Sequence, residues 1–252
     1  RLDAWEQGPV TATAENVLGV VCEITGRWPE ALDHLENSYR LWKTLDDRHQ
    51  QALVSDNLAT LYFYRGDFED AAAIYRRNLA FWETLEAIDE AGYAALNLGS
   101  IFLARCALDA AKQHDQRSLT AFERTKNSKL LALARNNLGF LALAQGRPED
   151  AHALFEASAA ADPNAENHRG LAEAEILLGR WDTAQAFAEQ SLALARAASM
   201  AVEEGAALRV MGLVHSGRGD QAGARRFLES SRDLLRKLGA RYELARTLTQ
   251  LA

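Results

Sequence analysis

The strongest constraint on this 252-residue chain is a phrase that recurs along its whole length: glycine, four residues, alanine. Intact copies begin at Gly26, Gly66, Gly146, Gly179 and Gly219, and a copy without the glycine begins at Cys106. Successive starts are separated by one constant step, except that the step from Gly146 to Gly179 is shorter. Spacing this regular indicates one supersecondary unit, repeated so that each copy buries its apolar face against its neighbours.

A second phrase stands seven residues before each turn phrase and ends in a small residue. Its copies are Leu18-Gly19, Leu58-Ala59, Leu98-Gly99, Leu138-Gly139, Leu171-Ala172 and Met211-Gly212. A small residue here would let two helices approach closely. Within one unit, Leu58, Leu61 and Tyr62 recur at three- and four-residue steps, the period of an α-helix. We therefore expect each unit to be a helix, a tight turn and a second helix.

The turns carry residues suited to ending one helix and beginning the next. Gly66 can adopt the left-handed conformation that closes a helix, and Asp67 can cap the helix that follows. Pro29 and Pro148 fall in the first turn of a helix, where a missing N–H does no harm. A left-handed Cys106 would cost about 1–2 kcal/mol, so we expect this turn to be altered or weaker.

Aromatic residues keep the step of the repeat in the second helix of three units. Trp42, Trp82 and Phe122 could form a binding stripe, but burial between successive second helices is the stronger interpretation. Just before them, a polar position is held by Ser38, Asn78, Ser118, Ser158, Ser191 and Ser231. Cys22 takes a core-facing position in a first helix and is expected to pack rather than react.

These phrases resemble the consensus of the tetratricopeptide repeat family, and the resemblance covers essentially the whole chain. Asp162-Pro163-Asn164 also matches the family's closing Asp-Pro signal. The resemblance implies an all-α, right-handed solenoid of about six helix pairs, forming a single domain over residues 1–252. The expected units span 10–48, 49–88, 89–128, 129–163, 164–201 and 202–240, followed by a partial unit at 241–252. Leu2 to Trp5 aligns with the tail of a preceding second helix, so we expect a fragment of a longer protein.

Composition excludes several other classes of protein. Hydrophobic residues make up 48% of the chain and charged residues 25%, as in ordinary globular proteins, and only 4 prolines interrupt potential helices. Two cysteines cannot form a disulfide framework, and no apolar run reaches the ~20 residues that span a bilayer. A net charge of -7 disfavours nucleic acid as a partner. We expect a cytoplasmic protein that binds neither membrane nor nucleic acid.

The sequence contains no recognisable catalytic, cofactor or metal signature. The six histidines form no HExxH pair, and none lies beside a cysteine at zinc spacing. The glycine-rich segment 217–223 has the wrong spacing for a dinucleotide loop and no strand before it. The basic stretch at 225–237 is interpreted as a solvated helix face. The chain is therefore expected to be non-enzymatic, without cofactor or metal.

In the family, the first helix of each pair lines a concave groove, and the resemblance assigns lining positions here. Asn57, Asn97 and Asn137 recur at the step of the repeat and are expected to form a ladder along the groove. Their amides can contact a peptide backbone or a carboxylate, although asparagine is also the structural consensus at this position. The other expected lining residues are Asp56, Tyr93, Leu96, Ser100, Asn136, Phe140, Arg169 and Arg209.

The family's carboxylate clamp is incomplete in this chain. Leu53, Tyr93 and Leu133 stand where the clamp of short-repeat relatives has lysine. A groove that is apolar and carries asparagine amides at regular intervals fits a helical or extended peptide better than the acidic terminus of a peptide. The alternative is a small effector bound in the concave interior of the solenoid.

The resemblance extends to the sensor regions of large bacterial signalling ATPases and transcriptional activators. It implies a non-enzymatic interaction or effector-sensing module within a larger regulatory protein. A stand-alone peptide-binding scaffold and a regulatory array attached to an enzyme such as a protease stay open as alternatives. The end helices, lacking partners, could also join two copies into a homo-oligomer.

Overall fold

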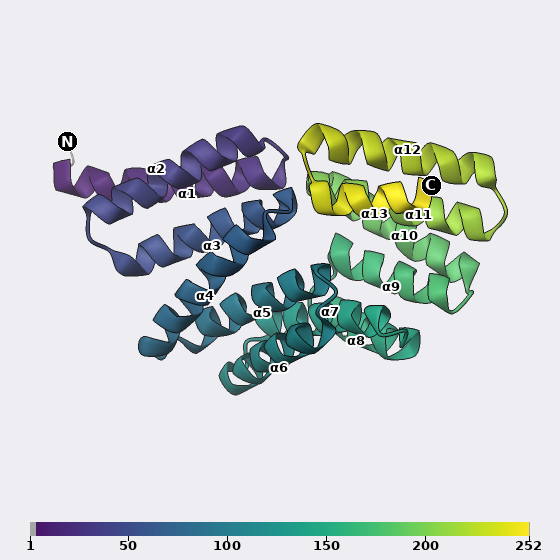
Figure 1. Ribbon diagram of the computed structural model, residues 1–252, viewed down its shortest axis with the longest axis horizontal. Coiled ribbons are helices and arrows are strands. Elements are labelled where there is room, and N and C mark those ends of the chain that lie inside the picture. The colour runs from purple at the N-terminus through teal and green to yellow at the C-terminus, as the bar shows by residue number, and fades with distance from the viewer. Residues whose placement is uncertain (1–3, 252) are drawn as a thin grey trace.

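The computed structural model describes residues 4–251, which form thirteen α-helices joined by short turns and no strand. The helices are α1 (Ala4–Ile24), α2 (Trp28–Thr44), α3 (Arg48–Arg65), α4 (Phe68–Thr84), α5 (Ile88–Ala104), α6 (Leu108–Thr125), α7 (Ser128–Ala144), α8 (Pro148–Ala161), α9 (Ala165–Leu177), α10 (Trp181–Ala197), α11 (Ala201–Gly217), α12 (Gln221–Leu238) and α13 (Arg241–Leu251). They stack as six antiparallel pairs followed by α13 (Figure 1). This arrangement confirms the all-α solenoid expected from the repeats.

The start of the chain differs from the expectation of a preceding second helix. Residues 2 and 3 lie outside the described part, but Ala4 and Trp5 already belong to α1, which continues to Ile24. The Gly8-Pro9 step does not interrupt this helix. No turn phrase separates Trp5 from the rest of α1, so the backbone has no signal to stop.

The expected glycine turn is present between α3 and α4. Gly66 has φ 79°, and its N–H bonds to the Phe63 carbonyl at 2.9 Å while the Asp67 N–H reaches Tyr62 at 2.8 Å. This pattern satisfies the last carbonyls of α3. Asp67, however, does not cap α4 with its side chain. Its carboxylate instead pairs with Arg65 and with Arg241, which comes from the far end of the chain.

The expectation of an altered turn at Cys106 is wrong. Cys106 adopts φ 59°, and its N–H bonds to the Leu103 carbonyl at 2.9 Å, as in the glycine turns. Packing of the two flanking helices therefore imposes the same geometry on a residue with a Cβ atom. Four more non-glycine residues take a left-handed conformation after second helices: Asp46, Glu86, Lys126 and Ser199.

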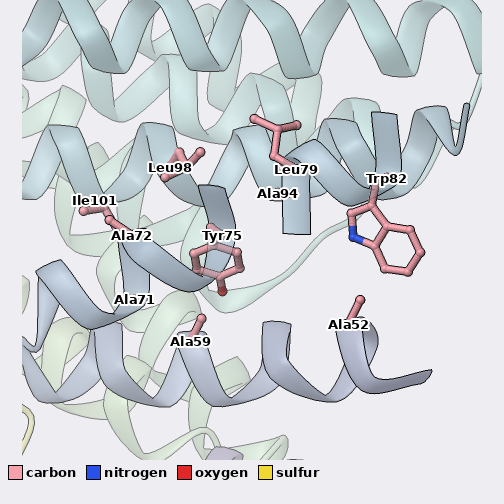
Figure 2. Packing of buried hydrophobic residues seen from close by; sticks show 10 residues of the cluster. All are labelled: Ala52, Ala59, Ala71, Ala72, Tyr75, Leu79, Trp82, Ala94, Leu98 and Ile101. Carbon is pink, nitrogen blue, oxygen red and sulfur yellow. The ribbon is translucent and has the colours of Figure 1, made fainter. Parts of the chain in front are cut away.

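Large side chains fill the space between successive units. Tyr75 of α4 is 1% exposed and lies between the helices that carry Ala59 and Leu98 (Figure 2). Trp42, Trp82 and Phe122 are all buried, which confirms that they pack in the core rather than form a binding stripe. Cys22 is also buried, and Pro29 and Pro148 lie in the first turn of their helices, as expected.

Small residues allow the two helices of each pair to touch. A Cβ atom on Gly19 would lie 2.6 Å from Leu35, and one on Gly139 would lie 2.7 Å from Phe155. Contacts this short do not occur in proteins, so only glycine permits the observed packing. The second phrase of each repeat therefore sets how closely the helices approach.

The repeated polar position in the second helices makes a hydrogen bond to the first helix of the same pair. Ser38, Asn78, Ser158, Ser191 and Ser231 each donate to a backbone carbonyl 26 residues earlier, at 2.7 to 3.1 Å. Ser118 is the exception, because its hydroxyl bonds to the Asp115 carbonyl of its own helix. Five of the six pairs are thus held by the same polar contact.

The two ends of the solenoid meet. The turn after α1 contacts the end of α12, since a Cβ atom on Gly26 would lie 2.3 Å from Leu238. Trp28, Val202 and Leu235 belong to one buried cluster that joins α2, α11 and α12. Figure 1 shows these helix ends side by side. The superhelix is therefore closed into a ring.

The last helix is part of this closure. Leu244 of α13 packs on the same buried cluster, and Arg241 donates to the Arg65 carbonyl and the Asp67 carboxylate of the α3–α4 turn. α13 was expected to lack a partner, but it contacts both its neighbour α12 and the distant α3. Among the described helices, none is long and apolar enough to cross a membrane.

Candidate functional site

The ring surrounds a central cavity of about 540 Å³ that is partly open to solvent. Its wall is built from α3, α5, α7, α9, α11 and α13, and the second helices contribute only Tyr75 of α4. Apart from α1, the first helices thus face inward, because the tight turns return each second helix along the outside.

One part of the cavity wall is aromatic. Phe63, Tyr64, Tyr93, Phe140 and Tyr242 all contribute to it. The Tyr64 ring is stacked on Trp28 with centroids 6.3 Å apart, and Phe63 contacts Tyr242 at 5.8 Å. These rings hold one another in place and present a rigid, largely apolar surface to the interior.

Eight of the eleven groove residues expected from the sequence line this cavity. They are Tyr93, Leu96, Asn97, Ser100, Asn136, Asn137, Phe140 and Arg169. The other three, Asn57, Asp56 and Arg209, are not among the lining residues. The expected lining positions are therefore brought together on α5, α7 and α9.

Asn57 does not complete the expected ladder of amides. Its Nδ2 donates to Asn16 of α1 at 2.9 Å, so the amide joins α3 to the first helix of the preceding pair. Asp56 is buried, and its carboxylate accepts a hydrogen bond from Asn78 at 2.8 Å. Burial raises the pKa of Asp56 to about 6. Both residues lie between stacked helices, because α1 and α4 cover this side of α3.

The amides that do reach the cavity are already partly engaged by the protein. Asn137 donates to the Leu96 carbonyl at 3.0 Å and to the Ser100 hydroxyl at 2.8 Å, which joins α7 to α5. Asn136 donates to Asn167 of α9 at 2.7 Å. These side chains therefore link successive first helices, and what they offer a ligand is mainly their oxygen atoms.

A network of charges lies beside the aromatic residues of the wall, since Arg169 contacts the Phe140 ring and Arg246 the Tyr242 ring. Glu173 of α9 accepts from Arg209 at 2.9 Å and Arg246 at 3.1 Å, and it lies 3.3 Å from Arg169. Arg169 also pairs with Glu203 at 3.0 Å. Three helices that are far apart in sequence, α9, α11 and α13, are thus joined by ion pairs.

The carboxyl groups of this network titrate differently. Burial alone would raise the pKa of Glu173, but Arg246, Arg209 and Arg169 outweigh it and hold that pKa well below its usual range. The pKa of Glu166 shifts in the opposite direction. Burial and the nearby carboxylate of Glu203 raise its pKa to about 7, since Arg169 alone offsets them only in part.

The sequence prediction missed the acidic members of the network and the contribution of α13. A signal for one of them was available, because the position held by Leu53, Tyr93 and Leu133 recurs in the following unit as Glu166. The contributions of Tyr242, Glu243 and Arg246 depend on the closure of the ring, which no local pattern indicates. Arg209 was expected in the groove but does not line the cavity; it is buried and pairs with Glu173.

The described residues contain no group of three or more histidine, cysteine or acidic side chains that could hold a metal ion. The two cysteines are free, Cys22 buried and Cys106 exposed. The chemistry available in the cavity is therefore ion pairing, hydrogen bonding and contact with aromatic faces.

Fold and cavity together define a helical-repeat protein with a central cavity. The family model for the tetratricopeptide repeat matches residues 10–84, 90–164 and 162–237. The chain therefore belongs to the tetratricopeptide repeat family. No curated protein matches the sequence.

Several solved structures share the fold at low sequence identity. A Rap protein complexed with Competence and Sporulation Factor has a TM-score of 0.72 and 15% identity, over 92% of this chain and 72% of that one. The Rap conjugation gene regulator of plasmid pLS20, in complex with the Phr* peptide, gives 0.75 and 13%, over 94% and 72%. NprR in complex with its cognate peptide NprX gives 0.70 and 12%, over 99% and 73%.

Proposed function

We propose that the chain is a cytoplasmic, non-enzymatic binding module that takes a short peptide or a small effector into its central cavity. The observation that carries this proposal is the cavity of about 540 Å³, lined by six first helices. Ligand sites are typically concave, roughly 300–1,000 Å³ in volume, and mostly apolar with a few well-placed polar groups. The aromatic wall, the amides and the charged network match that description.

Size and closure also favour this function over the scaffold alternative. A cavity of this volume suits a small molecule or a few residues of peptide. An extended protein segment would need a groove open at both ends, whereas here Gly26 contacts Leu238 and Arg241 contacts Asp67 across the gap. A ligand inside the ring would touch helices from both ends of the chain, and its binding would therefore be coupled to the ring's shape.

The similar structures lend further support to this proposal. Two of them are complexes with a named peptide, and one of those proteins is called a gene regulator. By analogy of fold, we propose that this chain acts as the sensing part of a larger regulatory or signalling protein. Its partner is then the peptide or effector in the cavity. Binding would be signalled to the rest of the protein by a change in the shape of the ring.

The test is capture of low-molecular-weight compounds from an extract of the source cell, followed by native mass spectrometry. The wild-type chain is compared with Leu133→Trp, in which a larger side chain fills part of the cavity. Leu85→Trp is the matched control, because Leu85 is exposed and does not line the cavity. A compound retained by wild type and Leu85→Trp, but lost from a folded Leu133→Trp, is the expected result. Equal retention by all three proteins would contradict the proposal.

A further inference from the structure

The charged side of the cavity does not balance its own charges. The network over α9, α11 and α13 contains four carboxylates but only three guanidinium groups. Its members are Glu166, Glu173, Glu203, Glu243, Arg169, Arg209 and Arg246. A partly buried carboxylate without a counter-charge is costly, because burial removes part of the water that would solvate it.

The excess negative charge lies at Glu166. Its one ion pair within the described residues is a long contact of 3.4 Å to Arg169, and Arg169 makes shorter contacts to Glu203 at 3.0 Å and Glu173 at 3.3 Å. The Glu166 side chain lines the cavity and keeps 39% of its surface exposed, so part of it is accessible to a ligand. By contrast, Glu173 is surrounded by three guanidinium groups and has nothing further to offer a ligand.

A further carboxyl group, outside this network, adds to the negative potential. Glu23 of α1 is 9% exposed, and its carboxylate forms no ion pair or hydrogen bond with the described residues. It acts electrostatically on Tyr64, Tyr75 and Tyr93, which all line the cavity. Burial raises its pKa to about 7, and no cation of the described residues compensates it.

Aromatic faces in the same cavity are already used to hold cations. The Arg169 guanidinium lies 4.6 Å from the centroid of Phe140, and that of Arg246 lies 5.9 Å from the centroid of Tyr242. Tyr64 and Tyr93 hold no such cation among the described residues, yet Tyr64 lies in the field of Glu166, Glu203 and Glu23. An aromatic face beside carboxylates is a favourable place for a positive group.

We infer that the ligand carries an organic cation, an ammonium or guanidinium group, which contacts Tyr64 and Tyr93 and is neutralised by Glu166 together with Glu203. A metal ion does not fit, because the described residues contain no cluster of ligands for one. This inference rests on the proposed function, since it specifies the chemistry of the ligand in the same cavity. The cation can belong to a basic peptide residue or to a free amine.

In the absence of ligand, we expect Glu166 to be partly protonated near neutral pH. The pKa of Glu166 is raised to about 7 by burial and by Glu203, with Glu243 acting in the same direction and Arg169 against it. Entry of a cation replaces that proton and restores the ionised form. Cation binding is therefore expected to release protons and to strengthen as the pH rises from 6 to 8.

Two synthetic pools of blocked tetrapeptides test the inference at pH 8. Both vary apolar and aromatic residues at three positions, and the fourth is Arg or Lys in one pool and Gln or Ser in the other. Agmatine and spermidine serve as free amines, and binding is measured by calorimetry. The variants are Glu166→Gln, which keeps the size of the side chain, and the exposed control Glu156→Gln.

The expected result is binding of the cationic pool or an amine, weakened roughly tenfold or more by Glu166→Gln and unchanged by Glu156→Gln. Binding of an amine but of neither pool would identify the source as a small molecule. Equal binding of both pools, or no effect of Glu166→Gln while Leu133→Trp abolishes binding, overturns the cation inference and leaves the cavity function intact. If neither pool nor either amine binds, the cation inference fails, and the capture experiment with Leu133→Trp decides the cavity function separately.

Discussion

Arg246, on the last helix, donates a hydrogen bond to Glu173 of α9 at 3.1 Å, across 73 residues of sequence. The same carboxylate accepts from Arg209 of α11 and lies beside Arg169. One buried side chain therefore fixes the relative positions of three helices that line the cavity. The strength of such a network comes from its completeness, because removing one member leaves the others buried and uncompensated.

We predict that Glu173→Gln lowers the free energy of unfolding by about 3 kcal/mol at pH 7, because three guanidinium groups lose their shared carboxylate. Urea denaturation measures this change. Arg246→Met in the Glu173→Gln background should then cost less than Arg246→Met alone, by about 1–2 kcal/mol. Strictly additive effects of the two changes would show that the pair is not coupled.

The repeat pattern could predict the helix pairs, the buried aromatic residues and most of the first-helix positions that face the cavity. Those features depend on contacts within a unit or between neighbouring units, which recur with the sequence period. The closure of the ring could not be predicted this way. It depends on Arg241 contacting Asp67 and on Leu238 contacting Gly26, and each of these pairs joins opposite ends of the chain.

The difference between local preferences and tertiary contacts also explains two wrong expectations. Asp67 is a good helix cap by residue type, but the distant Arg241 competes for its carboxylate. Cys106 is a poor residue for a left-handed turn, but packing of α5 on α6 imposes that turn regardless. In both cases tertiary contacts override a local preference, and only the structure reveals which one prevails.

Leu238→Asp should open the ring without unfolding the helix pairs. Leu238 is partly buried against the buried cluster at the junction between the chain ends, and a carboxylate there would remain unpaired in apolar surroundings. Small-angle X-ray scattering should report a larger radius of gyration with unchanged helical circular dichroism. Leu85→Asp is the control, since Leu85 is 50% exposed away from the junction. An unchanged radius would mean that Leu238 does not hold the ends together.

Cys106→Gly should stabilise the protein by about 0.5–1 kcal/mol. Cys106 has φ 59°, a conformation that costs a residue with a Cβ atom about 1–2 kcal/mol, partly offset by the greater chain entropy of glycine in the unfolded state. Cys106→Ala removes the thiol but keeps the Cβ atom, so it should leave stability nearly unchanged. Equal effects of the two substitutions in thermal denaturation would attribute the change to the thiol instead of the backbone.

Glu23 should make the protein less stable as the pH rises. Its pKa is about 7 when folded against 4.5 ordinarily, so between these values the folded state binds more protons than the unfolded one. Stability contributed by the protonated form is therefore present at pH 4.5 and lost progressively up to pH 7. Glu23→Gln should match wild type at pH 4.5 and exceed it by roughly 2–3 kcal/mol at pH 8. A difference that does not vary with pH would exclude this titration.

The repeated serine of the second helices offers a matched pair of substitutions. Ser158→Ala removes the 2.7 Å hydrogen bond to the Ala132 carbonyl, which joins α8 to α7, and should cost about 1 kcal/mol. Ser118→Ala changes the same repeat position, equally buried, but its hydroxyl bonds only within α6. It should therefore cost clearly less, because no contact between helices is lost. Chemical denaturation of the two variants distinguishes a polar link between helices from a general preference for a small side chain, since the latter predicts that both alanines are equally tolerated.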